Sequence, residues 1–120
     1  LSEHPQLETL RLPSMNVGRN ECAALSTLLR HTTTELHDLN LYQNGIDDER
    51  VESLVGALLA NSNLHKLTLS DNRITDRGCQ SLAGLLEQPK SNLEELRLSF
   101  NNIGVKGHVF LQFHWPAITN

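Results

Sequence analysis

The sequence predicts an α/β solenoid of four strand–helix repeats, and two observations support this fold class. A phrase close to L-x-x-L-x-L-x-x-N-x-L recurs with starts at residues 7, 36, 64 and 93, which are 29, 28 and 29 residues apart. Each of the first three phrases is followed by a stretch with helical periodicity. A fixed period in this range is typical of a repeat array in which neighbouring units cover one another's apolar faces. We therefore expect a parallel sheet on a concave side and helices on a convex side.

The core of each phrase alternates apolar and polar residues, which is typical of a half-buried strand. We expect strands, give or take a residue, at Thr9–Pro13, Asp38–Tyr42, Lys66–Ser70 and Glu95–Ser99. Stacking in register would place two leucines per strand on the inner face: Leu10/Leu12, Leu39/Leu41, Leu67/Leu69 and Leu96/Leu98.

An asparagine follows three residues after the last strand leucine in three of the repeats, as Asn44, Asn72 and Asn101. An amide at this point can bond backbone groups that the sheet no longer satisfies. We expect a structural ladder of asparagines along the array. The first repeat departs from it, with Met15 in this slot.

The helices are predicted from apolar residues spaced i, i+3, i+4, i+7, which form one face of an α-helix. Asp47 or Asp48 and Thr75 or Asp76 are the expected N-caps. The fourth helix departs from the pattern, since two of its four stripe positions, His108 and Gln112, are polar. The stripes are Cys22, Leu25, Ser26, Leu29; Val51, Leu54, Val55, Leu58; and Cys79, Leu82, Ala83, Leu86.

The domain organisation follows from the repeats. Residues 1–120 form a single domain with repeats at approximately 7–35, 36–63, 64–92 and 93–120, expected to be a segment of a longer array. Residues 108–120 are either an improvised cap, with Phe110, Phe113 and Trp115 over the open end, or a truncated repeat.

Composition excludes several classes of partner. With 10 Lys+Arg against 14 Asp+Glu and no basic stripe, the chain is not expected to bind nucleic acid. No apolar run is long enough for a membrane span. The two cysteines lie two repeats apart, too far for a disulfide, and no N-x-[ST] site is present. We expect an intracellular, cytoplasmic protein.

These phrases resemble the ribonuclease-inhibitor-like subfamily of leucine-rich repeats. The resemblance covers residues 7–111 and rests on the 28/29-residue period with a full helix in each repeat. It implies the horseshoe fold and a role in binding other proteins. The asparagine slot lacks the alternating cysteines of the ribonuclease inhibitor. The chain therefore looks more like Ran GTPase-activating proteins or the sensing arms of nucleotide-binding immune receptors.

Binding is expected on the concave face, where four columns of side chains should point. Aromatic and arginine anchors dominate interface energies, which favours Arg11, Tyr42, Arg97 and Phe100. The other candidates are Asp38, Asn40, Lys66, Thr68, Asp71 and Glu95.

Catalytic and metal sites are not expected. His37 and His65 share one repeat slot, but no cysteine or carboxylate completes a zinc set. No catalytic constellation or phosphate-binding glycine loop is present. A GTPase activator would need a loop arginine, for which Arg19, Arg73 and Arg77 are candidates.

The sequence thus indicates a module that binds a protein partner, without cofactor, metal or small-molecule substrate. Two alternatives remain open: a fragment of a Ran-type GTPase-activating protein, and a sensing or autoinhibitory arm of a nucleotide-binding leucine-rich-repeat receptor. A plain segment of a longer scaffold is a further possibility.

Overall fold

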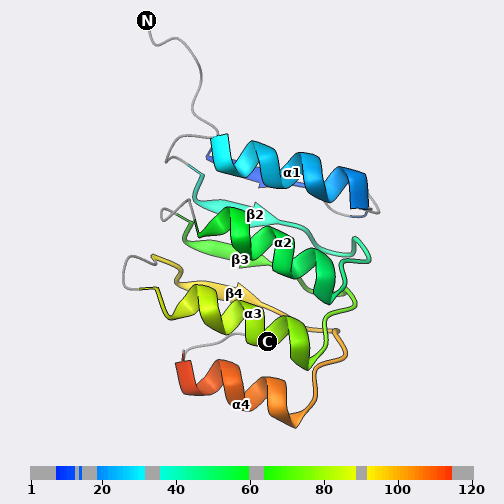
Figure 1. Ribbon diagram of the computed structural model, residues 1–120, viewed down its shortest axis with the longest axis vertical. Coiled ribbons are helices and arrows are strands. Elements are labelled where there is room, and N and C mark those ends of the chain that lie inside the picture. The colour runs from blue at the N-terminus through cyan, green and yellow to red at the C-terminus, as the bar shows by residue number, and fades with distance from the viewer. Residues whose placement is uncertain are drawn as a thin grey trace, which may run out of the picture.

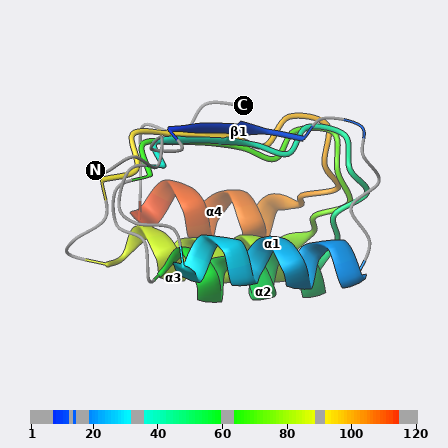
Figure 2. The same ribbon diagram turned by 90° about the horizontal axis from the view of Figure 1, so that it is seen from above.

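The structure is a computed structural model that describes residues 8–12, 14, 19–31, 36–59, 64–88 and 92–114. The strands pair in parallel in the order β1-β2-β3-β4. The helices stack beside one another along the long axis (Figure 1), and sheet and helices form two separate layers (Figure 2). The predicted α/β solenoid of four strand–helix repeats is confirmed. In chain order its elements are β1 (Thr9–Arg11), α1 (Arg19–His31), β2 (Asp38–Asn40), α2 (Asp48–Leu58), β3 (Lys66–Thr68), α3 (Asp76–Leu86), β4 (Glu95–Arg97) and α4 (Val105–His114).

The strands begin where the sequence predicts but end two residues earlier. Backbone pairing continues beyond them, since Leu41 N donates to Thr68 O at 2.9 Å and Gln43 N donates to Ser70 O at 3.0 Å. The chain then turns at a residue in the left-handed region, which breaks the extended geometry. These turning residues are Ser14, Gln43, Asp71 and Phe100, with φ of 57°, 59°, 60° and 59°.

The core lies between the two layers. Strand leucines from the second, third and fourth repeats are buried, while Leu10 and Leu12 of the first repeat are partly buried. The predicted helix stripes are also buried, except that α3 buries Leu85 and leaves Leu86 only partly covered. Burial of these side chains drives the stacking of repeats.

Asparagines in the loops after the strands join each repeat to the one before it. Asn72 Oδ1 accepts hydrogen bonds from Asn44 N and Ile46 N, both at 2.9 Å. Its Nδ2 donates to Leu41 O at 3.1 Å and to Leu69 O at 2.9 Å. One amide therefore satisfies backbone groups of two repeats that no sheet partner reaches.

The other two ladder residues make corresponding bonds. Asn101 Oδ1 accepts from Ile74 N at 2.9 Å, and its Nδ2 donates to Leu69 O at 2.9 Å. Asn44 Nδ2 donates to Leu12 O at 2.5 Å.

A second contact between repeats joins an aspartate at the start of one helix to the start of the next helix. Asp48, the first residue of α2, accepts hydrogen bonds from Thr75 N at 2.8 Å and Gly78 N at 3.0 Å. Thr75 is the N-cap of α3 and Gly78 is its third residue. The carboxylate thereby satisfies N–H groups that a helix N-terminus leaves unpaired, at the positive end of the helix dipole. We call this contact the cross-repeat cap.

The same contact recurs one repeat further along the array. Asp76 Oδ1 accepts hydrogen bonds from Gly104 N at 2.8 Å and Gly107 N at 2.9 Å, at the start of α4. The contact requires glycine as the third helical residue. A Cβ on Gly78 would lie 2.5 Å from Asp48 Oδ1, and one on Gly107 would lie 2.5 Å from Asp76 Oδ1.

The expected N-caps are therefore only partly correct. Asp47 caps α2, since its Oδ1 accepts from Arg50 N at 3.1 Å. Burial acts to raise the pKa of the Asp47 carboxyl, but the hydrogen bonds and charge of Arg50 outweigh it and hold that pKa below its ordinary value. Thr75 is the N-cap residue of α3, as expected, but the expected hydrogen bond to its side-chain oxygen is not formed. The Thr75 side chain makes no cap bond and donates to Asp48, which supplies the cap from the preceding repeat.

Gly78→Ala will lower the free energy of unfolding by about 1–3 kcal/mol, because the added methyl overlaps Asp48 and Ile74. Gly84→Ala in the same helix is the matched control, since a Cβ there meets nothing within 4 Å. It will stabilise the protein by up to about 1 kcal/mol through helix propensity. Urea unfolding followed by circular dichroism measures both; equal effects would contradict the cross-repeat cap.

Asn72→Ala will destabilise the protein by about 2 kcal/mol or more, because it leaves buried N–H and C=O groups of two repeats without partners. Asn102→Ala is the control, since this exposed neighbour makes no side-chain hydrogen bond within the described part of the chain. Thermal unfolding of both variants provides the measurement. Coincident transitions would mean that the ladder contributes nothing to stability.

Candidate functional site

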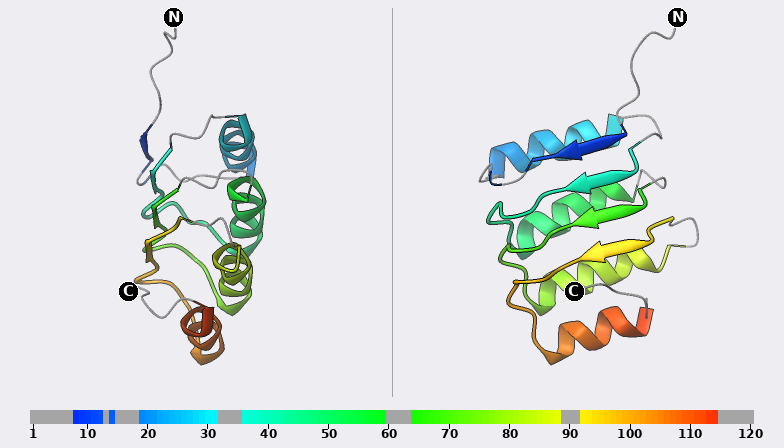
Figure 3. Two further views of the ribbon diagram at one scale, coloured as in Figure 1. Left: turned by 90° about the vertical axis from the view of Figure 1, so that its left-hand side faces the viewer. Right: turned by 180° about the vertical axis from the view of Figure 1, so that it is seen from behind.

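Figure 3 shows that one side of the sheet faces away from the helices; this is the concave face, toward which the polar residues of the strands are expected to point. Strand register sets them in straight rows across the sheet. One row contains Asp38, Lys66 and Glu95. The second contains Arg11, Asn40, Thr68 and Arg97.

Ion pairs connect the charged residues of this face. Glu95 pairs with Arg97 and lies 4.0 Å from Lys66 Nζ, while Arg11 lies 4.0 Å from Asp38. Such exposed pairs contribute at most about 1 kcal/mol each to stability. Their main effect is that each of these three cations lies near an acid on the same face.

Two polar atoms on the concave face are buried without a hydrogen-bond partner among the described residues. They are Asp38 Oδ1 and Thr68 Oγ1. Register places Thr68 two residues along the strand next to Asp38. Only 7% of Thr68 is exposed, so it offers less surface to a partner than the sequence pattern suggests. Burying polar atoms without a hydrogen-bond partner is unfavourable.

The four left-handed residues form a rim where the strands turn into the loops. In the first two repeats the rim residues bond each other, as Ser14 Oγ donates to Gln43 Oε1 at 2.8 Å. Phe100 ends the row with 82% of its surface exposed. Tyr42, next to Gln43, is 40% exposed.

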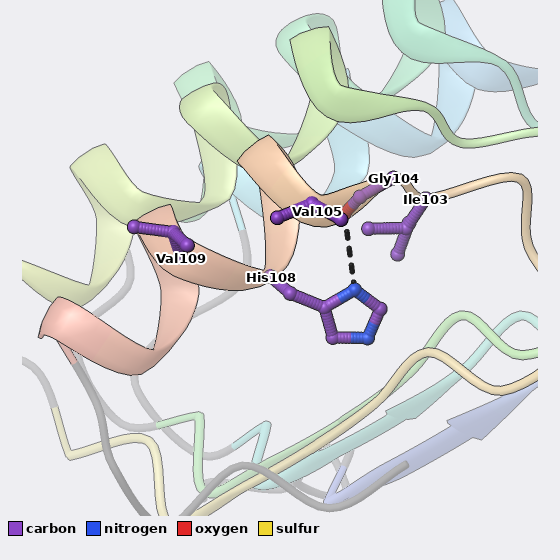
Figure 4. Close-up of a pocket in the computed structure, with 5 residues that line it drawn as sticks. All are labelled: Ile103, Gly104, Val105, His108 and Val109. Carbon is purple, nitrogen blue, oxygen red and sulfur yellow. Dashed lines mark hydrogen bonds between the residues drawn. The ribbon is translucent and has the colours of Figure 1, made fainter.

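A shallow pocket at the start of α4 is lined by Ile103, Gly104, Val105, His108 and Val109 (Figure 4). His108 occupies the slot that holds Cys79 and Val51 in earlier repeats, and its Nδ1 lies 3.1 Å from Gly104 O. Val105 occupies the slot of the capping aspartates and is 81% exposed. The expected stripe position Leu111 is buried. Of the suggested cap of residues 108–120, the side chains of Gln112 and Phe113 and all of residues 115–120, including Trp115, lie outside the described part.

The structure describes the surroundings of His37 and His65 and of two of the three loop arginines, Arg73 and Arg77. The rings of His37 and His65 are edge-to-face with centroids 4.9 Å apart. No group of three or more His, Cys, Asp or Glu residues suitable for a metal occurs in the described ranges. Arg77 is bound by Glu52 at 2.8 Å and 3.0 Å, which raises the pKa of the guanidinium. Arg73 is exposed, and the Arg19 side chain lies outside the described part.

Comparison with known proteins identifies the repeats. The family model for the leucine-rich repeat matches residues 60–83 and 90–111. These matches lie in the third and fourth repeats, and the parallel strand–helix array is a leucine-rich-repeat solenoid in its fold. Its 28- and 29-residue strand–helix units agree with the resemblance to the ribonuclease-inhibitor-like subfamily.

One similar solved structure is described as leiomodin-1 actin-binding site 2, with a TM-score of 0.72 and 17% sequence identity. The alignment covers 92% of this chain and 64% of that one. No curated protein sequence matches the leucine-rich-repeat chain. None of its described helices is long and apolar enough to cross a membrane.

Sequence reasoning missed the groups that lack partners on the concave face. Whether Asp38 Oδ1 and Thr68 Oγ1 form hydrogen bonds depends on the directions of their side chains, which the alternation of apolar and polar residues does not predict. The left-handed rim had a usable signal, because Ser14, Gln43 and Asp71 are polar residues at the end of each strand and turns favour such residues. Phe100 in the same slot gives no such signal.

The thiols provide a further test of this geometry. Cys22 and Cys79 are free and buried. Burial, then the charges of Asp76 and Asp48, raise the pKa of the Cys79 thiol to about 12. The folded protein keeps this thiol protonated, so its stability is fully present below the ordinary thiol pKa of 9.0. As the pH rises from 9.0 toward about 12, the unfolded chain ionises the thiol while the folded protein does not, and stability is lost.

In a Cys22→Ala background, iodoacetamide will therefore label native Cys79 at pH about 8 only as fast as the protein opens, because the thiolate is the nucleophile. In concentrated guanidinium chloride the same thiol will react at the rate of a free cysteine. Mass spectrometry measures the labelled fraction. Rapid labelling of the native protein would contradict the burial of this slot.

Proposed function

We propose that the chain is a protein-binding module whose partner contacts the concave face of the sheet. The observation that carries this proposal is the strand register, which aligns charged and polar side chains in rows on the concave face. Arg11, Lys66 and Arg97 lie near acids in these rows. Two exposed aromatic residues, Tyr42 and Phe100, follow the strands. Arginine and aromatic side chains are frequent interface anchors.

The leucine-rich repeats and the similar fold support the same function. The neighbouring structure is described as an actin-binding site. At 17% identity the similarity supports a common fold but not a common ligand, so actin is one candidate among protein partners. We propose binding without catalysis, with no cofactor, in an intracellular setting where the free thiols Cys22 and Cys79 stay reduced.

A rigid face favours binding because its residues lose little conformational entropy when the partner binds. The ladder and the cross-repeat caps fix the backbone of each repeat against its neighbour. The partner then meets side chains already held in register, and the entropic cost on this side of the interface is small.

Replacement of two concave arginines tests the proposal. The chain, immobilised in its wild-type form, will retain specific proteins from a lysate of its source cells. The double variant Arg11→Ala/Arg97→Ala will retain those proteins more than about tenfold less well, since arginine is a frequent interface anchor. Quantitative mass spectrometry of the retained proteins measures the difference.

The control removes two exposed cations from the helical layer, as Arg30→Ala/Lys106→Ala. It will retain the same proteins at the wild-type level. Equal losses in both variants, or no loss in the concave one, would show that the partner does not use the concave face. Matching unfolding midpoints for the two variants establish that both are folded.

A further inference from the structure

We propose that Tyr42, Asp71 and Phe100 form a site for a cationic side chain, lysine or arginine, of the protein partner. This inference rests on the proposed function and specifies the chemistry of the partner at one edge of the same face. Three observations support it: the backbone of Phe100, the arrangement of the three residues, and the charge of Asp71.

Phe100 has an unfavourable backbone conformation that its own side chain does not offset. Its φ of 59° lies in the left-handed region, where a Cβ crowds the following carbonyl. Asp71 in the same slot belongs to a residue type that tolerates this conformation, and Gln43 hydrogen-bonds to Ser14. Phe100 instead leaves 82% of its surface in solvent. The turn of the repeat sets the φ of Phe100, but nothing in that turn calls for an exposed aromatic ring, which is available to a partner.

Backbone hydrogen bonds place the three side chains on adjacent segments. Asp71 N donates to Ser99 O at 2.7 Å, which sets Asp71 beside Phe100. Gln43 N donates to Ser70 O at 3.0 Å, which sets the segment of Tyr42 on the other side of Asp71. Adjacent segments in such a sheet lie about 4.8 Å apart. Asp71 thus lies beside Phe100 on one side and beside Gln43 on the other, with the exposed Tyr42 one residue before Gln43, so that one long side chain can span the three residues.

Within the described part of the chain, no cation pairs with the acidic group of this site. The Asp71 carboxylate makes no hydrogen bond or ion pair with any described residue. Asp38 and Glu95, the other acids of the concave face, each lie near a cation. Arg73 is exposed two residues away and forms no ion pair with Asp71.

Both components of the site favour a positive charge. The carboxylate attracts it directly, and the faces of the flanking aromatic rings carry negative potential that attracts lysine and arginine. An acidic group would be repelled by Asp71, and an apolar group would remove water from that carboxylate without replacing it. A lysine or arginine side chain satisfies the aromatic and acidic parts together.

A fluorescein-labelled tetra-arginine peptide is the probe, and its neutral isostere tetra-citrulline shows the contribution of charge. Fluorescence polarisation measures both against the intact chain. Wild type will bind tetra-arginine and bind tetra-citrulline at least about fivefold more weakly. Asp71→Asn and Phe100→Ala will each weaken tetra-arginine binding about fivefold, as expected for loss of one exposed ionic or cation–π contact.

Glu21→Gln is the matched control, because it removes the same charge from an exposed position on α1. It will change the affinity less than about twofold, the effect expected for a screened distant charge. Equal losses in Asp71→Asn and Glu21→Gln would overturn the site in favour of general attraction to an acidic protein. Equal binding of the two peptides, or none by wild type, would also overturn it.

The lysate experiment separates this inference from the proposed function. Neither Arg11 nor Arg97 belongs to the rim site, so their replacement tests the concave face independently. Loss of the partner in Arg11→Ala/Arg97→Ala with full retention in Asp71→Asn would overturn the cationic site and leave the function standing. Loss in both variants, with retention in Glu21→Gln, supports both proposals.

Discussion

The stability of each helix in the second half of the array depends on a carboxylate from the repeat before it. A helix N-terminus has N–H groups without intrahelical partners, and a capping side chain usually comes from the same turn of chain. Here Asp48 and Asp76 supply the cap from a neighbouring repeat. The start of α3 or α4 is therefore fully bonded only when the preceding repeat is folded against it, which couples neighbours beyond the burial of leucines.

The repeat pattern made most of the architecture predictable. Leucine spacing set the strand starts and the buried helix stripes, because one periodicity determines which face is covered. The cross-repeat cap was not predictable in this way, since Asp47 and Asp48 are chemically identical. Only the three-dimensional offset between helices decides that Asp47 caps its own helix and Asp48 the next one. Gly78 and Gly107 were the usable signal, because glycine within a helix is unfavourable unless a close contact requires it.

The candidate site was predictable to a smaller extent. Alternation along each strand was sufficient to assign residues such as Arg11 and Lys66 to the concave face. It does not determine how far each side chain is covered, and Thr68 is almost fully buried. The ladder and caps use polar groups between the repeats, whereas Asp38 and Asp71 keep carboxylate oxygens without a hydrogen bond on the concave side. The hydrogen bonds that make the array rigid thus lie between the repeats, whereas the polar atoms without a hydrogen bond in the described part lie on the concave side.

The positions of the aspartate and the glycine of the cross-repeat cap determine which repeat could be duplicated without losing the cap. The segment 76–104 carries both the acid of Asp76 and the glycine of Gly78, so a tandem copy inserted in frame would form a matched junction with itself. The segment 48–75 carries Arg50 where Gly78 stands one repeat later, and its copy would bring a side chain against Asp48. A duplication of the third repeat would therefore preserve the cross-repeat cap, whereas a duplication of the second would disrupt it.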